Sequence, residues 1–158
     1  MVTKQNAGSV QAPDGSQYVT LTDGVGNLGN LMSTQYPVPA VAGVTSLQSS
    51  SGNVAAATAT STLTGVASKT NYLTGFSFTS AGATAASVVT GTVTGLLGGT
   101  MSFTVPVVAG ATLANPTIQM QFQPSLPASA ANTSIVVSVP SLGAGNTNAT
   151  VSAWGYQI

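Results

Sequence analysis

The stretch KTNYLTGFSFTSAGATAASVVTGTVTGLLGGTMSFTV, residues 69–105, carries the clearest structural signal in this chain of 158 residues. Large side chains occupy alternate positions in its first and last parts, which is the period of a β-strand with one buried face. Small and glycine-rich segments at 80–84 and 95–99 allow the chain to reverse between the runs. We therefore predict three consecutive antiparallel strands that pair as a meander. The alternate positions expected on one face are Tyr72, Thr74, Phe76 and Phe78 in the first strand and Met101, Phe103 and Val105 in the last.

Strand patterns continue outside this stretch, whereas a helical pattern persists nowhere. No apolar i, i+3, i+4, i+7 repeat is sustained, and the helix-forming residues Glu and Arg do not occur. Seven or eight strands in about a hundred residues, joined by Gly, Pro and Ser turns, predict an all-β fold, an antiparallel β-sandwich or jelly roll. The other strand candidates are residues 54–63, 118–123, 134–139 and 148–158, of which 134–139 has the continuous apolar character of a central strand.

The run IQMQFQ, residues 118–123, alternates three large apolar side chains with three glutamines. This pattern is typical of a strand with one buried side and one solvated or partner-facing side. Pro116 and Pro124 bracket the run. Because proline has no ladder N–H, we expect these two residues to mark the ends of the strand.

The first third of the chain differs in composition from the remainder. It holds three of the four charged residues, a Pro-Val-Pro triplet at 37–39, the tract SLQSSSGN at 46–53 and one short strand candidate at 18–22. We therefore expect an extended N-terminal arm over residues 1–53, followed by a β-sandwich domain over residues 54–158. Such an arm becomes ordered by lying on its own domain, on a sister subunit or on a larger partner. The large apolar residues expected to anchor it are Tyr18, Leu21, Leu28, Leu31, Met32 and Tyr36.

The charge content excludes several classes of function. The charged side chains are Lys4, Asp14, Asp23 and Lys69, which give a formal net charge of zero, and no His, Cys or Glu occurs. Both aspartates precede glycines, as turn residues do, so we expect no catalytic site, no metal and no other cofactor. Nucleic-acid binding needs many cationic contacts to phosphate, which two lysines do not provide. A chain near zero net charge tends instead to associate with other proteins.

The chain also lacks the signals of a membrane or exported protein. The start, MVTKQNAGSV, has no apolar segment after its lysine, and no run approaches ~20 apolar residues. We therefore expect no membrane association and no Sec export. Asn132 and Asn148 fit the pattern of glycosylation sites, but without export we interpret them as turn and strand residues. The Thr-x-Thr steps at 58–62, 60–64 and 90–94 suggest an ice-binding face, but ordinary β-propensity explains them better because no fixed period stacks them.

Four short segments make the C-terminal half recognisable. They are KTNYLTGF at 69–76, GGT at 98–100, PASAANT at 127–133 and LGAGNTN at 142–148. Together they resemble small all-β virion structural proteins of tailed bacteriophages and prophages, including capsid decoration (cement) proteins. The segment DGSQYVTLTDGVGN, residues 14–27, is also similar to the leaders of phage structural proteins. These are turn and strand signatures, and they cover much of the C-terminal hundred residues.

The resemblance implies a non-enzymatic protein that forms trimers or clusters and binds the outer surface of an assembled phage head. Its partner there would be the major capsid protein, and its effect would be to brace neighbouring capsomers. It would be synthesised in the host cytoplasm and located on the capsid surface of the virion. The alternatives within the virion are the base of a head fibre or a tail-associated structural protein.

Three aromatic residues support a different class of function. In a carbohydrate-binding β-sandwich, Tyr72, Trp154 and Tyr156 would be exposed platforms on which sugars stack. Aromatic side chains bury ~150–250 Å² each and dominate cores and interfaces, so we expect these three in the core or at a subunit interface. A glycan array distinguishes the carbohydrate-binding class from the virion class.

Overall fold

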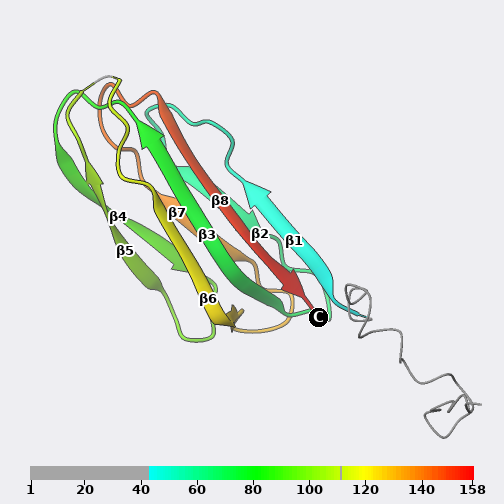
Figure 1. The fold of residues 1–158 in the computed structure, drawn as a ribbon. Helices are drawn as coiled ribbons and strands as arrows, with labels where there is room; N and C mark the ends of the chain where they lie inside the picture. The colour runs from blue at the N-terminus through cyan, green and yellow to red at the C-terminus, as the bar shows by residue number, and fades with distance from the viewer. Residues whose placement is uncertain (1–42, 111) are drawn as a thin grey trace, which may run out of the picture. The chain divides into compact units, whose positions relative to one another are not determined.

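Eight strands make up the part of the chain that the computed structural model describes, residues 43–110 and 112–158 (Figure 1). Two four-stranded antiparallel sheets form a sandwich, with the orders β1-β8-β3-β6 and β2-β7-β4-β5. This confirms the predicted all-β fold. The strands are β1 (Thr45–Ser50), β2 (Ala59–Leu63), β3 (Asn71–Ala81), β4 (Ser87–Thr94), β5 (Met101–Val107), β6 (Ile118–Pro127), β7 (Ile135–Val139) and β8 (Asn148–Gln157).

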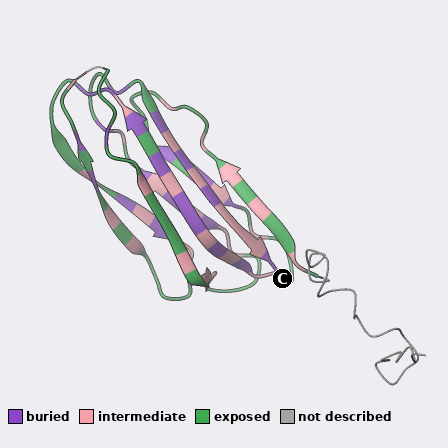
Figure 2. Ribbon diagram, viewed as in Figure 1, coloured by how far each residue is buried: buried purple, intermediate pink, exposed green. Residues whose placement is uncertain are grey.

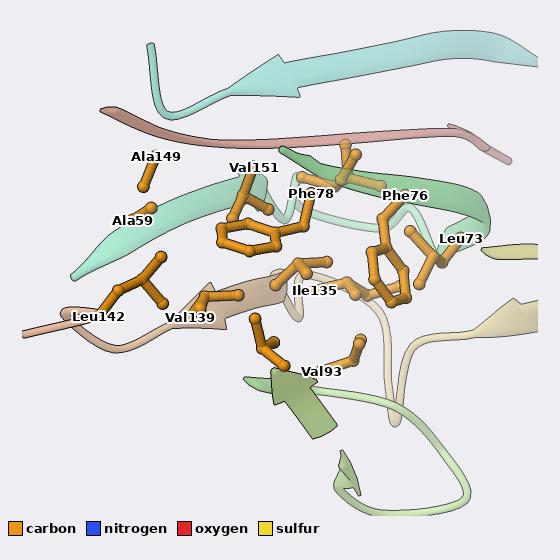
Figure 3. Packing of buried hydrophobic residues seen from close by; sticks show 14 of the residues in the cluster. Ala59, Leu73, Phe76, Phe78, Val93, Ile135, Val139, Leu142, Ala149 and Val151 are labelled. Carbon is orange, nitrogen blue, oxygen red and sulfur yellow. The ribbon is translucent and has the colours of Figure 1, made fainter. Parts of the chain in front are cut away.

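The core lies between the two sheets and is built from the side chains of each strand that face inward. Along β7, Ile135, Val137 and Val139 are fully buried while the residues between them are half-buried, and Figure 2 shows similar alternation along β3. Phe76 and Phe78 of β3 project toward β7 in Figure 3. Each large apolar side chain buried in this way stabilises the fold by roughly 1.5–3 kcal/mol. The central position predicted for residues 134–139 is confirmed, since β7 lies between β2 and β4.

The prediction that three consecutive strands form a meander is wrong. β4 and β5 do form a hairpin, with Val93 opposite Met101. β3, however, lies between β8 and β6, so the segment between β3 and β4 carries the chain from one sheet to the other. The physical reason is that the apolar sides of β3 and β4 belong to opposite walls of the same core. Alternation along a strand indicates which side is buried but does not identify the neighbouring strand.

β6 continues past Pro124, where we expected it to end. β6 is an edge strand that pairs only with β3, and their register shifts so that Leu126 is opposite Leu73 while Gln121 is opposite Gly75. Residues 122–125 therefore lie in a bulge, where Pro124 does not have to donate a ladder hydrogen bond.

β1 lies within the segment that we assigned to the N-terminal arm. It pairs with β8 along its whole length, from Thr45 opposite Gln157 to Ser50 opposite Ser152, and Leu47 packs against the core. The tract SLQSSS has the composition of a linker, but an edge strand needs only backbone hydrogen bonds and a few inward apolar contacts. The predicted anchors Tyr18, Leu21, Leu28, Leu31, Met32 and Tyr36 lie outside the described residues.

A buried asparagine amide fastens the end of the sandwich where β3 begins. The Asn71 Nδ2 group donates hydrogen bonds to the carbonyl oxygens of Leu63, at 2.9 Å, and Thr133, at 3.2 Å. These carbonyls belong to the end of β2 and to the loop before β7, in the sheet opposite β3. The amide therefore ties the two sheets together at this end.

Replacing this amide tests its contribution. We expect Asn71→Ala to lower the free energy of unfolding by about 1–3 kcal/mol, because two carbonyl oxygens lose a donor in a site closed to solvent. Urea denaturation followed by tryptophan fluorescence measures the difference. The matched control is Asn53→Ala, because the Asn53 amide bonds to Asn148 Oδ1 in an exposed position. Equal losses for the two variants would contradict the assigned role.

Candidate functional site

Tyr72, Trp154 and Tyr156 lie on the outer face of the sheet β1-β8-β3-β6. Along β8, Val151 and Ala153 are buried in the core, and the alternate positions, which include Trp154 and Tyr156, are half-buried and point away from it. Tyr72 of β3 is directly opposite Tyr156. None of the three rings belongs to the core cluster, so core packing, one of the two roles expected for them, is wrong. Their role at a subunit interface stays a prediction.

A bulge in β3 places Tyr72 on this outer face. The sequence alternation put Tyr72 on the same side as Phe76 and Phe78, but both phenylalanines are fully buried and Tyr72 is not. The register with β8 shifts here, since Leu73 pairs with Gly155 and Gly75 pairs with Trp154. One additional residue reverses the faces of a strand, so the side chains before it and after it point to opposite sides.

The two tyrosine rings form a rigid pair. Their centroids are 5.0 Å apart and their planes differ by 7°, which is a stacked arrangement between neighbouring strands. Aromatic pairs of this kind contribute about 0.5–1.5 kcal/mol beyond the area they bury. The pair therefore presents two stacked rings, each of which carries a hydroxyl group.

Trp154 lies over a glycine on the neighbouring strand. A Cβ atom placed on Gly75 would be 2.8 Å from Cζ2 of Trp154 and 2.6 Å from the carbonyl oxygen of Met120. Both distances are shorter than any ordinary van der Waals contact, so only glycine lets the indole lie this close to β3. The position of the indole therefore depends on the residue at 75.

Two shallow hollows flank the aromatic rings on this face. One has a volume of about 440 Å³ and lies beside Trp154, and the other has a volume of about 860 Å³ and lies beside Tyr156. Their linings combine aromatic rings and a few apolar side chains with amide and hydroxyl groups, and no charged side chain is among the described residues of either lining. The polar residues concerned are Ser46, Gln48 and Thr74 in the first hollow and Thr74, Gln121, Gln123 and Ser125 in the second.

Across residues 43–110 and 112–158, Lys69 is the one charged side chain. The same part of the chain contains no cluster of three or more His, Cys, Asp or Glu residues that could hold a metal ion. It also contains no helix with the length and apolar character needed to cross a membrane. The outer face of this sheet therefore offers stacking, apolar contact and neutral hydrogen bonds, which are the interactions of a binding surface.

The outer face of the other sheet is rich in hydroxyl groups. The strand register aligns Thr60, Ser138, Thr92 and Ser102 in one row across all four strands. The Thr-x-Thr steps of the sequence thus contribute to a single face, although they come from strands far apart in the chain. No aromatic ring stands on the pairs of this row, so it offers no stacking platform.

A third surface lies at the end of the sandwich that contains the β4–β5 turn. Leu97, in that turn, is 66% exposed, and Val66 and Ile158 are also exposed at this end (Figure 1). A mainly apolar hollow of about 420 Å³ adjoins Leu97 and is lined in addition by Met101 and Leu126. Exposed aliphatic side chains beside an apolar hollow are typical of a surface that another protein covers.

Comparison with known proteins gives no match, either to a protein-family model or to the sequence of a curated protein. The placement of side chains therefore has to indicate the function. Sequence reasoning named the three aromatic residues but missed Leu97 and the glutamines that border the rings. The glutamines were visible as the polar half of the 118–123 alternation, because that half faces the same side as Trp154.

The close approach of Trp154 to Gly75 can be tested with the protein's own fluorescence. Trp154 is the only tryptophan in the chain. We expect Gly75→Ala to push the indole toward solvent and shift its emission maximum to longer wavelength. Gly98→Ala is the control, because a Cβ atom there would have no neighbour within 4 Å. An unchanged spectrum for Gly75→Ala, or the same shift for both variants, would show that residue 75 does not position the indole.

Proposed function

We propose that this protein is a non-enzymatic structural protein of a tailed-phage virion, which decorates the outer surface of the head and braces neighbouring capsomers. Its partners in this role are the major capsid protein and further copies of itself, as a trimer. The proposal is supported by the resemblance of its turn and strand segments to phage virion proteins and by the nearly uncharged β-sandwich. The single observation that carries it is the convergence of three of those four segments on the end of the sandwich that contains Leu97 and the β4–β5 turn.

Three of the four segments that carry the resemblance meet at this end. Residues 69–76 begin β3, residues 98–100 follow Leu97 in the β4–β5 turn, and residues 127–133 form the loop between β6 and β7 (Figure 1). The backbone N–H of Asn132 donates to the carbonyl oxygen of Lys69 at 2.9 Å, which joins two of the segments directly. Three of the four segments that make the sequence resemble virion proteins therefore lie at one end of the sandwich.

The exposed aliphatic residues make this end suitable for docking. The Leu97 N–H donates to the carbonyl oxygen of Pro127 at 2.9 Å, so the β4–β5 turn is held against the end of β6 while the Leu97 side chain points to solvent. Covering about 800 Å² on each partner, with over half of it apolar, contributes on the order of 10 kcal/mol before the costs of association are subtracted. β1 also begins at this end, because Thr45 pairs with Gln157.

The docking surface is tested by placing a charge in it. We expect Leu97→Asp to reduce binding to heads assembled without this protein by at least about tenfold, because a carboxylate buried in an apolar contact has no partner. Co-sedimentation of the protein with such heads measures occupancy. Val88→Asp is the matched control, since Val88 is 67% exposed against 66% for Leu97 and lies at the opposite end of β4. Equal occupancy for the two variants would place the docking surface elsewhere.

The arm is tested by deletion. Tyr18, Leu21, Leu28, Leu31, Met32 and Tyr36 stay the predicted anchors of the arm on the capsid or on a sister subunit. We expect a variant without residues 1–42 to retain the thermal unfolding transition of the sandwich, because β1 begins at Thr45, and to lose binding to heads. Circular dichroism and co-sedimentation measure the two properties. Full occupancy after the deletion would contradict the role of the arm.

A further inference from the structure

We propose that the outer face of the sheet β1-β8-β3-β6 is a binding site for neutral carbohydrate, centred on Tyr72, Trp154 and Tyr156. The site is separate from the proposed contact with the phage head and goes beyond it. The rings stand outside the core, held in place by the tyrosine stack and by the close approach of the indole to Gly75. A surface that is fixed before the ligand arrives loses little conformational freedom on binding.

The chemical character of this face matches a sugar. A pyranose ring has an apolar side of C–H groups and a rim of hydroxyl groups, each of which both donates and accepts hydrogen bonds. Aromatic rings accept the C–H side, and primary amides both donate and accept at the rim. Here the rings of Trp154 and Tyr156 are flanked by the amides of Gln48, Gln121 and Gln123.

The two hollows give room for more than one sugar unit. The hollow beside Trp154 measures about 440 Å³ and the one beside Tyr156 about 860 Å³, and both are lined by Thr74. One hollow lies toward β1 and the other toward β6. Because Thr74 borders both, the hollows adjoin across the strands, and an oligosaccharide can contact both rings. The expected ligand is therefore an oligosaccharide.

Charge decides which sugars fit. Among the described residues, no charged side chain lines either hollow, so this part of the chain provides no counter-ion there for a uronic acid, a sialic acid or a phosphate. Burying such an anion without a partner is unfavourable. The same absence argues against single-stranded nucleic acid, which combines aromatic stacking with cationic contacts to its backbone. The neutral linings favour hexoses, N-acetylhexosamines and deoxyhexoses.

A second protein is the less suitable occupant. Glutamine, serine and threonine side chains line both hollows beside a few apolar residues, whereas the most exposed aliphatic residues, Leu97 and Val88, lie on other surfaces. The fully buried centre of a stable protein interface is more apolar than the rest of the surface. The aromatic rings form a narrow strip within a polar face, which suits a narrow ligand.

In the experiment, the full chain is first screened on an array of neutral and acidic oligosaccharides. The neutral ligand that binds most strongly is then titrated into the protein while the emission of Trp154 is recorded. Because Trp154 is the only tryptophan, a saturable change in emission reports binding at this face. We expect neutral oligosaccharides to bind in preference to acidic ones. Gln121→Ala and Tyr156→Ala should each weaken binding by about threefold to tenfold, with the thermal unfolding transition retained for Gln121→Ala.

The control variant is Thr92→Ala, on the outer face of the other sheet, which should leave binding unchanged. The proposal is overturned if no neutral saccharide changes the emission at millimolar concentration, or if Gln121→Ala and Tyr156→Ala bind as tightly as the parent chain. It is also overturned if the emission depends on protein concentration without saccharide, which would assign the face to a second copy. A change in emission on removal of residues 1–42 would assign it to that segment. Phage heads are absent from the assay, so failure of head attachment does not affect the result.

Discussion

The structure depends on one register shift in β3. Before Thr74 the outward side chain is Tyr72, and after it the inward side chains are Phe76 and Phe78. Without the extra residue, the rings of Tyr72, Phe76 and Phe78 would lie on one side of the sheet. If that side faced outward, the core would lose two phenylalanines, and if it faced inward, a tyrosine hydroxyl would be buried among them. The shift instead supplies large apolar side chains to the core and an aromatic ring to the surface from a single alternating run. Gly75, the next residue, leaves the space that Trp154 occupies.

The ends of the sandwich are held by buried amides, in a chain that has neither disulfides nor, among the described residues, more than one charged side chain. Asn71 ties β2 and the loop before β7 to the start of β3. At the other end, Asn115 Nδ2 donates to Ser80 Oγ at 2.9 Å, and Asn146 Nδ2 donates to the carbonyl oxygen of Gly82 at 3.1 Å. Such bonds in a site closed to solvent are costly to break, so they determine how the loops leave β3 at both ends.

The class of fold could be predicted from the sequence because every second residue of a strand is buried in the core. That alternation located the seven strands from β2 to β8 and identified β7 as central. It could not assign β3 and β4 to different sheets, because pairing is decided by contacts between segments far apart in the chain. It also missed β1, whose serines pair through backbone groups that every residue possesses. For the site, Tyr72, Trp154 and Tyr156 could be named from the sequence, but the side of the sheet they occupy depends on the bulge at Thr74, which no residue pattern near it specifies.

The scarcity of charge affects both proposed surfaces in the same way. A contact made by ion pairs is weakened when salt screens the charges, whereas burial of apolar area and stacking on aromatic rings are not screened. Leu97 at the end of the sandwich and Trp154 on the outer face both offer the second type of contact. The two surfaces differ in the residues beside the apolar group, because mainly aliphatic residues lie beside Leu97 while amide and hydroxyl side chains lie beside Trp154 together with Leu47. An aliphatic surrounding favours a protein partner that excludes water completely, and a polar surrounding favours a ligand that has hydroxyl groups of its own.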